Sequence, residues 1–170
     1  MLSRVFFFQP EDGIRNLVRS RGLGDVYKRQ DITAGCIPTE NYTNWYAIKV
    51  VSGGKLGFTL VPNTSTDDYD FAFYGPYPNC GTLGSPVRCS YAANWSSYPN
   101  TGMNSTLNLS TNTGTGNNGS DQTEGAEGNG FADEIAVNAG ETYLVVVSKW
   151  SPGGNGFALN WILSNGASLD

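Results

Sequence analysis

The chain has 170 residues, a length that suits a single domain, and carries a formal net charge of −5. Only 15% of its residues are charged, 22 are glycine, and histidine is absent. The absence of histidine removes the commonest general base and the commonest transition-metal ligand. An acidic chain without a basic stripe also argues against binding to nucleic acid or to anionic lipid. This composition is typical of an extracellular β protein with long loops.

The first thirty residues differ from the rest of the chain. They contain six basic and three acidic residues, whereas residues 31–170 contain four basic and twelve acidic ones. Their apolar run, VFFF, is too short for the core of a signal peptide or for a membrane span. The string FFFQPEDGIRNLVRSRGLGDVYKRQ is also similar to translated sequencing-adapter sequence found at the ends of unrelated reads. We therefore interpret residues 1–30 as a non-native or disordered leader, expect the export signal to be missing, and assign residues 31–170 to one domain.

Alternating apolar residues and β-branched or aromatic runs predict strands throughout residues 31–170. The clearest predicted strands are residues 44–51, 56–60, 70–74, 142–150 and 157–163, and weaker ones are residues 87–92, 105–109 and 131–137. Residues 142–150 are apolar on both faces, as a central strand should be. Ser52, Gly53 and Gly54 predict a hairpin turn, and residues 111–130 predict a long loop. About eight short strands without helical periodicity predict an all-β fold, an antiparallel β-sandwich of jelly-roll type.

The chain has three cysteines, Cys36, Cys80 and Cys89. Cys80 and Cys89 enclose a short segment with two glycines and a proline, which closes easily. We therefore predict that these two form a disulfide if the protein is exported, and Cys36 is left over. The alternative is that Cys80 and Cys89 are free buried thiols.

Three carboxylates, Asp67, Asp68 and Asp70, lead into the strand predicted at residues 70–74. Calcium binds six to eight oxygen ligands, often from such closely spaced aspartates, so these residues together with Glu124 of the acidic loop are candidate calcium ligands. The alternative is that the aspartates only keep a strand end soluble. Two carboxylates could also catalyse glycoside hydrolysis, but nothing in the sequence raises a pKa or forms a cleft. We therefore expect no enzymatic activity, and calcium is the only cofactor candidate.

Four aromatic residues lie in or beside predicted loops, where an exposed ring could stack on a sugar. They are Tyr77, Trp95, Tyr98 and Trp150. The alternative is that these rings cover an edge of the core.

Several segments in order resemble one known type of domain. They are NWYAIKVVSGGKLGFTLVP, DDYDFAFYG, CGTLGSPVRCSYA and EGAEGNGFADEIAVNAGETYLVVVSKWSPGGNGFALNW. They resemble the pre-peptidase C-terminal-like β-sandwich domains of exported Bacteroidota proteins, particularly those that use type IX secretion. The resemblance covers about residues 31–170 and implies an accessory domain within a longer multidomain protein. It places Asp67, Asp68 and Asp70 at the acidic strand entrance of the family and Glu124 in its Ser/Thr-Glu-Gly segment.

The function expected from the sequence is that of a non-catalytic extracellular module, located outside the cell or on its surface, for adhesion or for spacing within a larger protein. The expected partners are a surface glycan or protein and other domains of a longer parent chain, with no nucleic acid and no membrane insertion. The alternative function is a carbohydrate-binding accessory domain attached to a secreted polysaccharide-degrading enzyme or protease.

Overall fold

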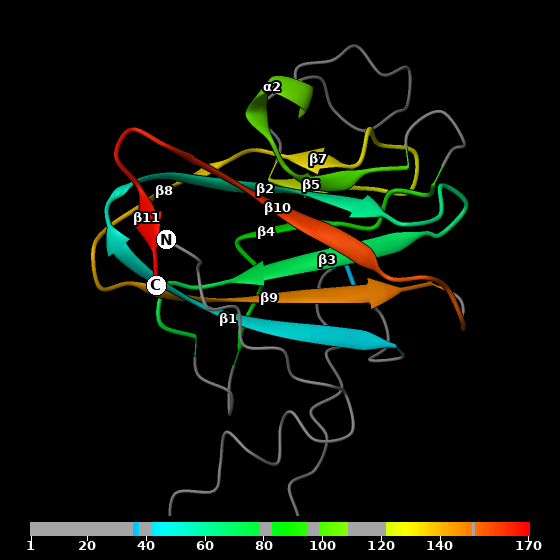
Figure 1. Cartoon of the computed structure of the whole chain (residues 1–170), viewed down its shortest axis with the longest axis horizontal. Coiled ribbons are helices and arrows are strands. Elements are labelled where there is room, and N and C mark those ends of the chain that lie inside the picture. The colour runs from blue at the N-terminus through cyan, green and yellow to red at the C-terminus, as the bar shows by residue number, and fades with distance from the viewer. Residues whose placement is uncertain (1–35, 38–41, 79–82, 95–98, 109–121, 151) are drawn as a thin grey trace, which may run out of the picture.

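The computed structural model describes residues 36–37, 42–78, 83–94, 99–108, 122–150 and 152–170. These residues form two β-sheets that pack face to face as two layers (Figure 1). The larger sheet has the strand order β11 (Ser168–Leu169), β1 (Thr43–Ser52), β9 (Thr142–Lys149), β3 (Tyr69–Tyr74), β4 (Arg88–Ser90) and β6 (Thr123–Glu124). The smaller sheet has the order β10 (Phe157–Ser164), β2 (Gly54–Pro62), β5 (Thr101–Met103) and β7 (Phe131–Ala132), and β8 (Ile135–Val137) also pairs with β2. The predicted all-β sandwich is confirmed.

Most strand pairs are antiparallel, and the two short pairs β4–β6 and β5–β7 are parallel. The strand β9 lies between β1 and β3 and is buried along nearly its whole length, so its predicted central position is confirmed. In the described part of the chain, no helix is long and apolar enough to cross a membrane.

The main hydrophobic core lies between the two sheets. The predicted alternation in β2 is confirmed, since Leu56, Phe58 and Leu60 are completely buried there. Phe58 contacts Phe71 of β3 edge to face, with ring centroids 5.0 Å apart. Such aromatic pairs stabilise a core by about 0.5–1.5 kcal/mol beyond their buried area. The alternating apolar faces of β2 and β3 therefore join the two sheets.

A second apolar cluster lies on the outer face of the larger sheet. Cys36 and Ile37 pack there against Ala72 and Tyr74 of β3 and Val146 of β9. All six residues of β3 are buried because the strand is covered on both faces. This arrangement explains why the sequence of β3 is nearly continuously apolar.

The predicted disulfide between Cys80 and Cys89 is wrong, because Cys89 is bonded to Cys36. Cys89 lies opposite Ala72 in the β3–β4 ladder, on the outer face that Cys36 and Ile37 cover. This packing brings the Cα atoms of Cys36 and Cys89 to 5.7 Å, although the residues are 53 positions apart. Cys80 lies outside the described residues. The prediction chose Cys80 because it is close to Cys89 in the sequence, whereas the fold brings Cys36 close to Cys89 in space.

Two local predictions are also wrong. The segment predicted as a strand at residues 105–109 forms a short helix, α2 (Ser105–Asn108). The Oδ1 atom of Asn104 accepts hydrogen bonds from the backbone N–H groups of Thr106 and Leu107, at 3.1 and 3.2 Å, which is an N-cap. The predicted hairpin at Ser52, Gly53 and Gly54 is instead a crossing between layers, because β1 and β2 lie in different sheets.

Candidate functional site

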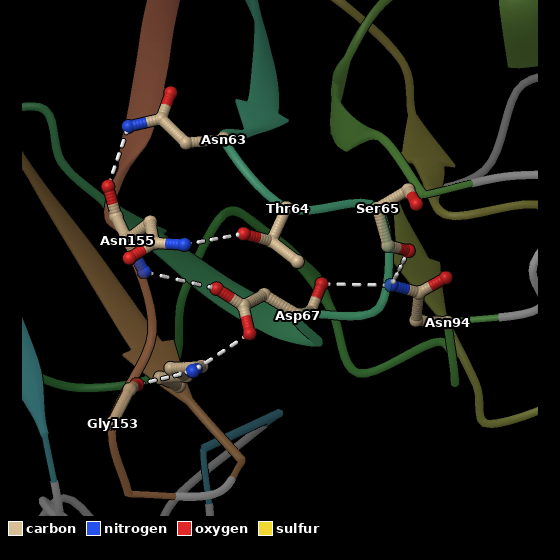
Figure 2. Close-up of polar contacts among 8 residues, drawn as sticks. Asn63, Thr64, Ser65, Asp67, Asn94, Gly153 and Asn155 are labelled. Carbon is tan, nitrogen blue, oxygen red and sulfur yellow. Dashed lines mark hydrogen bonds and ion pairs between the residues drawn. The ribbon is translucent and has the colours of Figure 1, made fainter.

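The acidic segment that precedes β3 lies at one end of the sandwich, where loops pass between the two sheets. Asp67 is central to a polar network at this end (Figure 2). Its Oδ1 atom is 2.9 Å from the Nζ atom of Lys149, and its Oδ2 atom accepts a hydrogen bond of 3.3 Å from the backbone N–H of Asn155. The side chains of Asp67 and Lys149 are 12% and 7% exposed, so the ion pair is largely shielded from water. The hydrogen bond from Lys149 lowers the pKa of Asp67.

The network joins the two loops that cross between the sheets at this end. The first loop connects β2 to β3, and the second connects β9 to β10. Asn155 donates a hydrogen bond of 2.8 Å to the hydroxyl of Thr64, and Asn63 donates one of 2.6 Å to the carbonyl of Asn155. Lys149 also donates to the carbonyl of Gly153. Asp67 therefore holds two chain segments together and has no carboxylate oxygen left free of protein contacts.

Asp70 has a different environment, although it is only three residues from Asp67. It lies on the outer face of β3, in a row with Ser148 of β9 and Thr43 of β1, and is only 5% exposed. Burial, together with the nearby charge of Asp68, raises the pKa of Asp70 to about 7. Burial also raises the pKa of Asp68, which is half-buried. Raised pKa values at Asp68 and Asp70 were not expected from the sequence, because the burial comes from neighbouring strands.

Glu124 lies on the opposite face of the larger sheet from Asp70. Glu124 is the register partner of Ser90 in the β4–β6 ladder, and Ser90 is the register partner of Phe71 in the β3–β4 ladder. Register partners point to the same face of a sheet. Because Phe71 faces the core, Glu124 does so as well. Glu124 is completely buried, and a Cβ atom at Gly128 would collide with its carboxylate. A side chain at position 128 would therefore force the buried Glu124 carboxylate to move.

These positions do not fit a calcium site formed by the four predicted ligands. Asp67 is engaged by a lysine, and Asp70 and Glu124 lie on opposite faces of one sheet. Among the described residues, no group of three or more His, Cys, Asp or Glu side chains could hold a metal ion.

A shallow hollow lies beside Asp68 and is also lined by Asn94, Asn100 and Asn129. The enclosed space is only about 10 Å³, far below the range of roughly 300–1,000 Å³ that is usual for small-molecule sites. The side chain of Asn94 donates hydrogen bonds to the carbonyls of Ser65 and Asp67, at 2.9 and 2.7 Å, and so holds the wall of the hollow in place (Figure 2). The hollow is suited to water or a small polar group.

The aromatic residues predicted to bind sugar do not form one platform. Tyr77 and Trp150 are 63% and 71% exposed, but they lie at opposite ends of β9. The backbone N–H of Tyr77 bonds to Thr142 at the start of β9, whereas Trp150 follows its last residue. A strand of this length separates them by roughly 25 Å. Trp95 and Tyr98 lie outside the described residues.

Sequence reasoning missed two exposed rings near the acidic segment. Tyr42 is 53% exposed, and its carbonyl accepts a hydrogen bond from Lys149, the residue before Trp150. Tyr91 is 45% exposed and directly follows β4, the strand beside β3. The backbone N–H of Trp150 bonds to the carbonyl of Asp68 at 3.1 Å. The register of neighbouring strands thus gathers three exposed aromatic residues around the start of β3, which sequence spacing could not reveal.

Comparisons of the chain with protein-family models, curated proteins and solved structures give no match.

Proposed function

We propose that this chain is a non-catalytic β-sandwich module of a larger exported protein, serving adhesion or spacing at the cell surface. The observation that carries the proposal is the disulfide between Cys36 and Cys89. Such bonds form and persist in oxidising compartments outside the cytosol. The bond fastens a segment onto the outer face of the larger sheet, as is useful in a module exposed outside the cell.

The positions of the carboxylates support a non-catalytic role. The Asp67 carboxylate is bonded to Lys149 and Asn155, and Asp70 is too deeply buried to touch a polymeric substrate. Asp68 is half-buried beside a shallow hollow. A glycosidase needs two carboxyl groups that flank a bound sugar. Asp68 is the only one of these three positioned to meet a ligand.

The proposal is tested by producing the full chain in the oxidising and in the reducing compartment of a bacterial host. We expect folded protein with the Cys36–Cys89 bond from the oxidising compartment and a less stable product from the reducing one. Thermal unfolding and mass mapping of unreduced peptides provide the measurements. Equal stability of the two products would contradict the exported role.

The alternative carbohydrate-binding role is favoured by one feature, the exposed residue Trp150, whose backbone N–H bonds to the carbonyl of Asp68 and which lies near Tyr42 and Tyr91. Exposed aromatic rings can stack on sugar rings, and a nearby carboxylate can accept hydrogen bonds from hydroxyls. If the module binds glycan here, Trp150→Ala should weaken binding about three- to tenfold, the range expected for loss of one aromatic contact. Affinity electrophoresis in soluble polysaccharides measures this effect.

Tyr77→Ala is the matched control, because Tyr77 is similarly exposed but lies at the far end of β9. A loss of binding in Trp150→Ala alone would place the sugar at the start of β3. If the unsubstituted protein binds no polysaccharide, spacing or adhesion to another protein is left as the function.

A further inference from the structure

The long edge strand of the smaller sheet, β10, has features that suit pairing with another strand. Among the described residues, β10 pairs with β2 on one side only and ends the sheet on the other. Edge strands normally carry lysine, proline or a bulge, which prevent such pairing. The sequence of β10, FALNWILS, has no charged residue, no proline and no glycine. Its eight pairs with β2 run without a bulge.

The other long strand near a sheet edge, β1, is protected. Its last residues are covered by β11, with an irregular register between Val50 and Ser52. It also carries an exposed lysine, Lys49. Among the long strands that the structure describes, the unprotected edge is therefore specific to β10.

The hydrogen-bond pattern shows which backbone groups of β10 point outward. The N–H of Asn63 bonds to the carbonyl of Gly156 at 2.9 Å, which makes these two opposite residues a hydrogen-bonded pair. Hydrogen-bonded and non-hydrogen-bonded pairs alternate along an antiparallel ladder. The backbone groups of Ala158, Asn160 and Ile162 therefore face β2. Those of the intervening residues, Phe157, Leu159, Trp161 and Leu163, face the open edge.

Side-chain exposure alternates only in the first part of β10, from Phe157 to Trp161. Phe157, Leu159 and Trp161 pack against the core but are only partly buried. Leu163 is 39% exposed. In the part of the chain that the structure describes, the sandwich is thus incompletely closed at this edge, and a further strand would cover these side chains.

We propose that β10 pairs with β10 of a second copy of this chain, antiparallel and with Asn160 on the two-fold axis. In this register Leu159 lies opposite Trp161 of the other copy, and Phe157 lies opposite its Leu163. Each of these residues has outward backbone groups, so the register forms a complete set of ladder hydrogen bonds. It also keeps the core-facing side chains of both copies on the same side of a continuous sheet.

Charge also favours a second copy over a charged partner strand. Residues 31–170 have a strongly acidic balance, which opposes association of two copies elsewhere on the surface. The neutral strand β10 brings no like charges together. A ladder of one strand from each copy is a small interface, so we expect a weak dimer that forms at high protein concentration.

The first experiment is sedimentation velocity of the full 170-residue chain from micromolar to submillimolar concentration. Asn160→Lys places two ammonium groups opposite each other on the exposed face and should weaken the dimer about fivefold or more. Asn160→Asp should do the same, and an equimolar mixture of the two variants should restore dimerisation. Leu107→Lys is the control, since it adds the same charge at a residue of α2 that is 39% exposed. The proposal is overturned if the unsubstituted protein stays monomeric, or if the Asn160→Lys variant dimerises as well as the unsubstituted protein.

A second experiment tests the register by crosslinking, with Cys80→Ser in all chains to leave Cys36–Cys89 as the remaining native pair. Opposite residues in a non-hydrogen-bonded pair have Cα atoms about 4.5 Å apart, which permits a disulfide. Asn160→Cys should therefore form a covalent dimer on oxidation. Ala158→Cys should not, because its symmetry mate would be roughly 13 Å away along the strands. Equal crosslinking of both variants would overturn the proposed register.

Discussion

Asp67 and Asp70 are the same residue type three positions apart, yet their protonation equilibria are shifted in opposite directions. The hydrogen bond from Lys149 lowers the pKa of Asp67, whereas burial raises that of Asp70. The difference arises because Asp67 lies beside Lys149 in a loop that crosses between the sheets, whereas Asp70 is buried on the outer face of the larger sheet. Charged groups stabilise a fold only where their charge has a partner.

Asp70→Asn should make the protein more stable at neutral pH. Because the folded-state pKa of about 7 exceeds the unfolded value, the native state binds more protons between roughly pH 4 and pH 7. The free energy of unfolding of the parent chain therefore falls through this window, and the variant should lose that slope. At pH 8 the variant should be more stable by about 2–4 kcal/mol, with no difference near pH 4. Urea unfolding at several pH values measures the free energy of unfolding of both proteins. If this free energy changed with pH in the same way in both, the buried environment of Asp70 would be contradicted.

The ion pair between Asp67 and Lys149 should show strong coupling. Asp67→Asn or Lys149→Met alone should lower the midpoint of thermal unfolding by several degrees, since each leaves a shielded partner without its counterion. The double variant should recover part of this loss. Because the pKa of Asp67 is lowered, its contribution is present above the unfolded-state pKa and is lost as the pH falls through the folded-state value. Additive losses in the double-mutant cycle would show that the two side chains act independently.

At the scale of elements, the structure depends on segments that connect the sheets and cover them. Asp67 joins the loop at residues 63–68 to residues 152–156, and the segment at Cys36 covers the outer face of β3 and β9. Neither arrangement follows from strand propensity. Both bring together residues that are distant in the sequence, which is why local reasoning chose Cys80 as the partner of Cys89.

Cys36→Ser should destabilise the chain, and Cys80→Ser should have little effect. A bond that spans 53 residues stabilises by about 4 kcal/mol in the chain-entropy model. Thermal unfolding of both variants, with and without reductant, measures the difference. Reductant should lower the midpoint of the parent and of Cys80→Ser but leave Cys36→Ser nearly unchanged. The reverse pattern would restore the pairing predicted from the sequence.

At the scale of the whole molecule, the acidic residues are distributed over different surfaces. Asp67 faces the loops at one end, Asp70 the outer face of the larger sheet and Glu124 the space between the sheets. The carboxylates that the sequence grouped as candidate calcium ligands therefore do not gather at one place in the structure. The exposed neutral edge of β10 is a property at this same scale, because it exists only when the sheet is assembled.

Calcium should not stabilise the described part of the chain through these carboxylates. A site filled at about a hundred times its Kd would add ~2.7 kcal/mol and raise the unfolding midpoint by several degrees. We expect the same midpoint in millimolar calcium and in excess chelator. A shift that disappears in the Asp68→Ala and Asp70→Ala variants would instead establish a metal site at the start of β3.

The sequence by itself determined the fold class and the main strands, because period-2 alternation and turn residues act locally. The alternation in β2, the two-sided burial of β9 and the strand β3 were all predictable. Tertiary structure alone decided the layer crossing after β1, the partner of Cys89 and the burial of Asp70. Each depends on which strands become neighbours, and strand pairing over long sequence separations is set by the packing of two complete sheets.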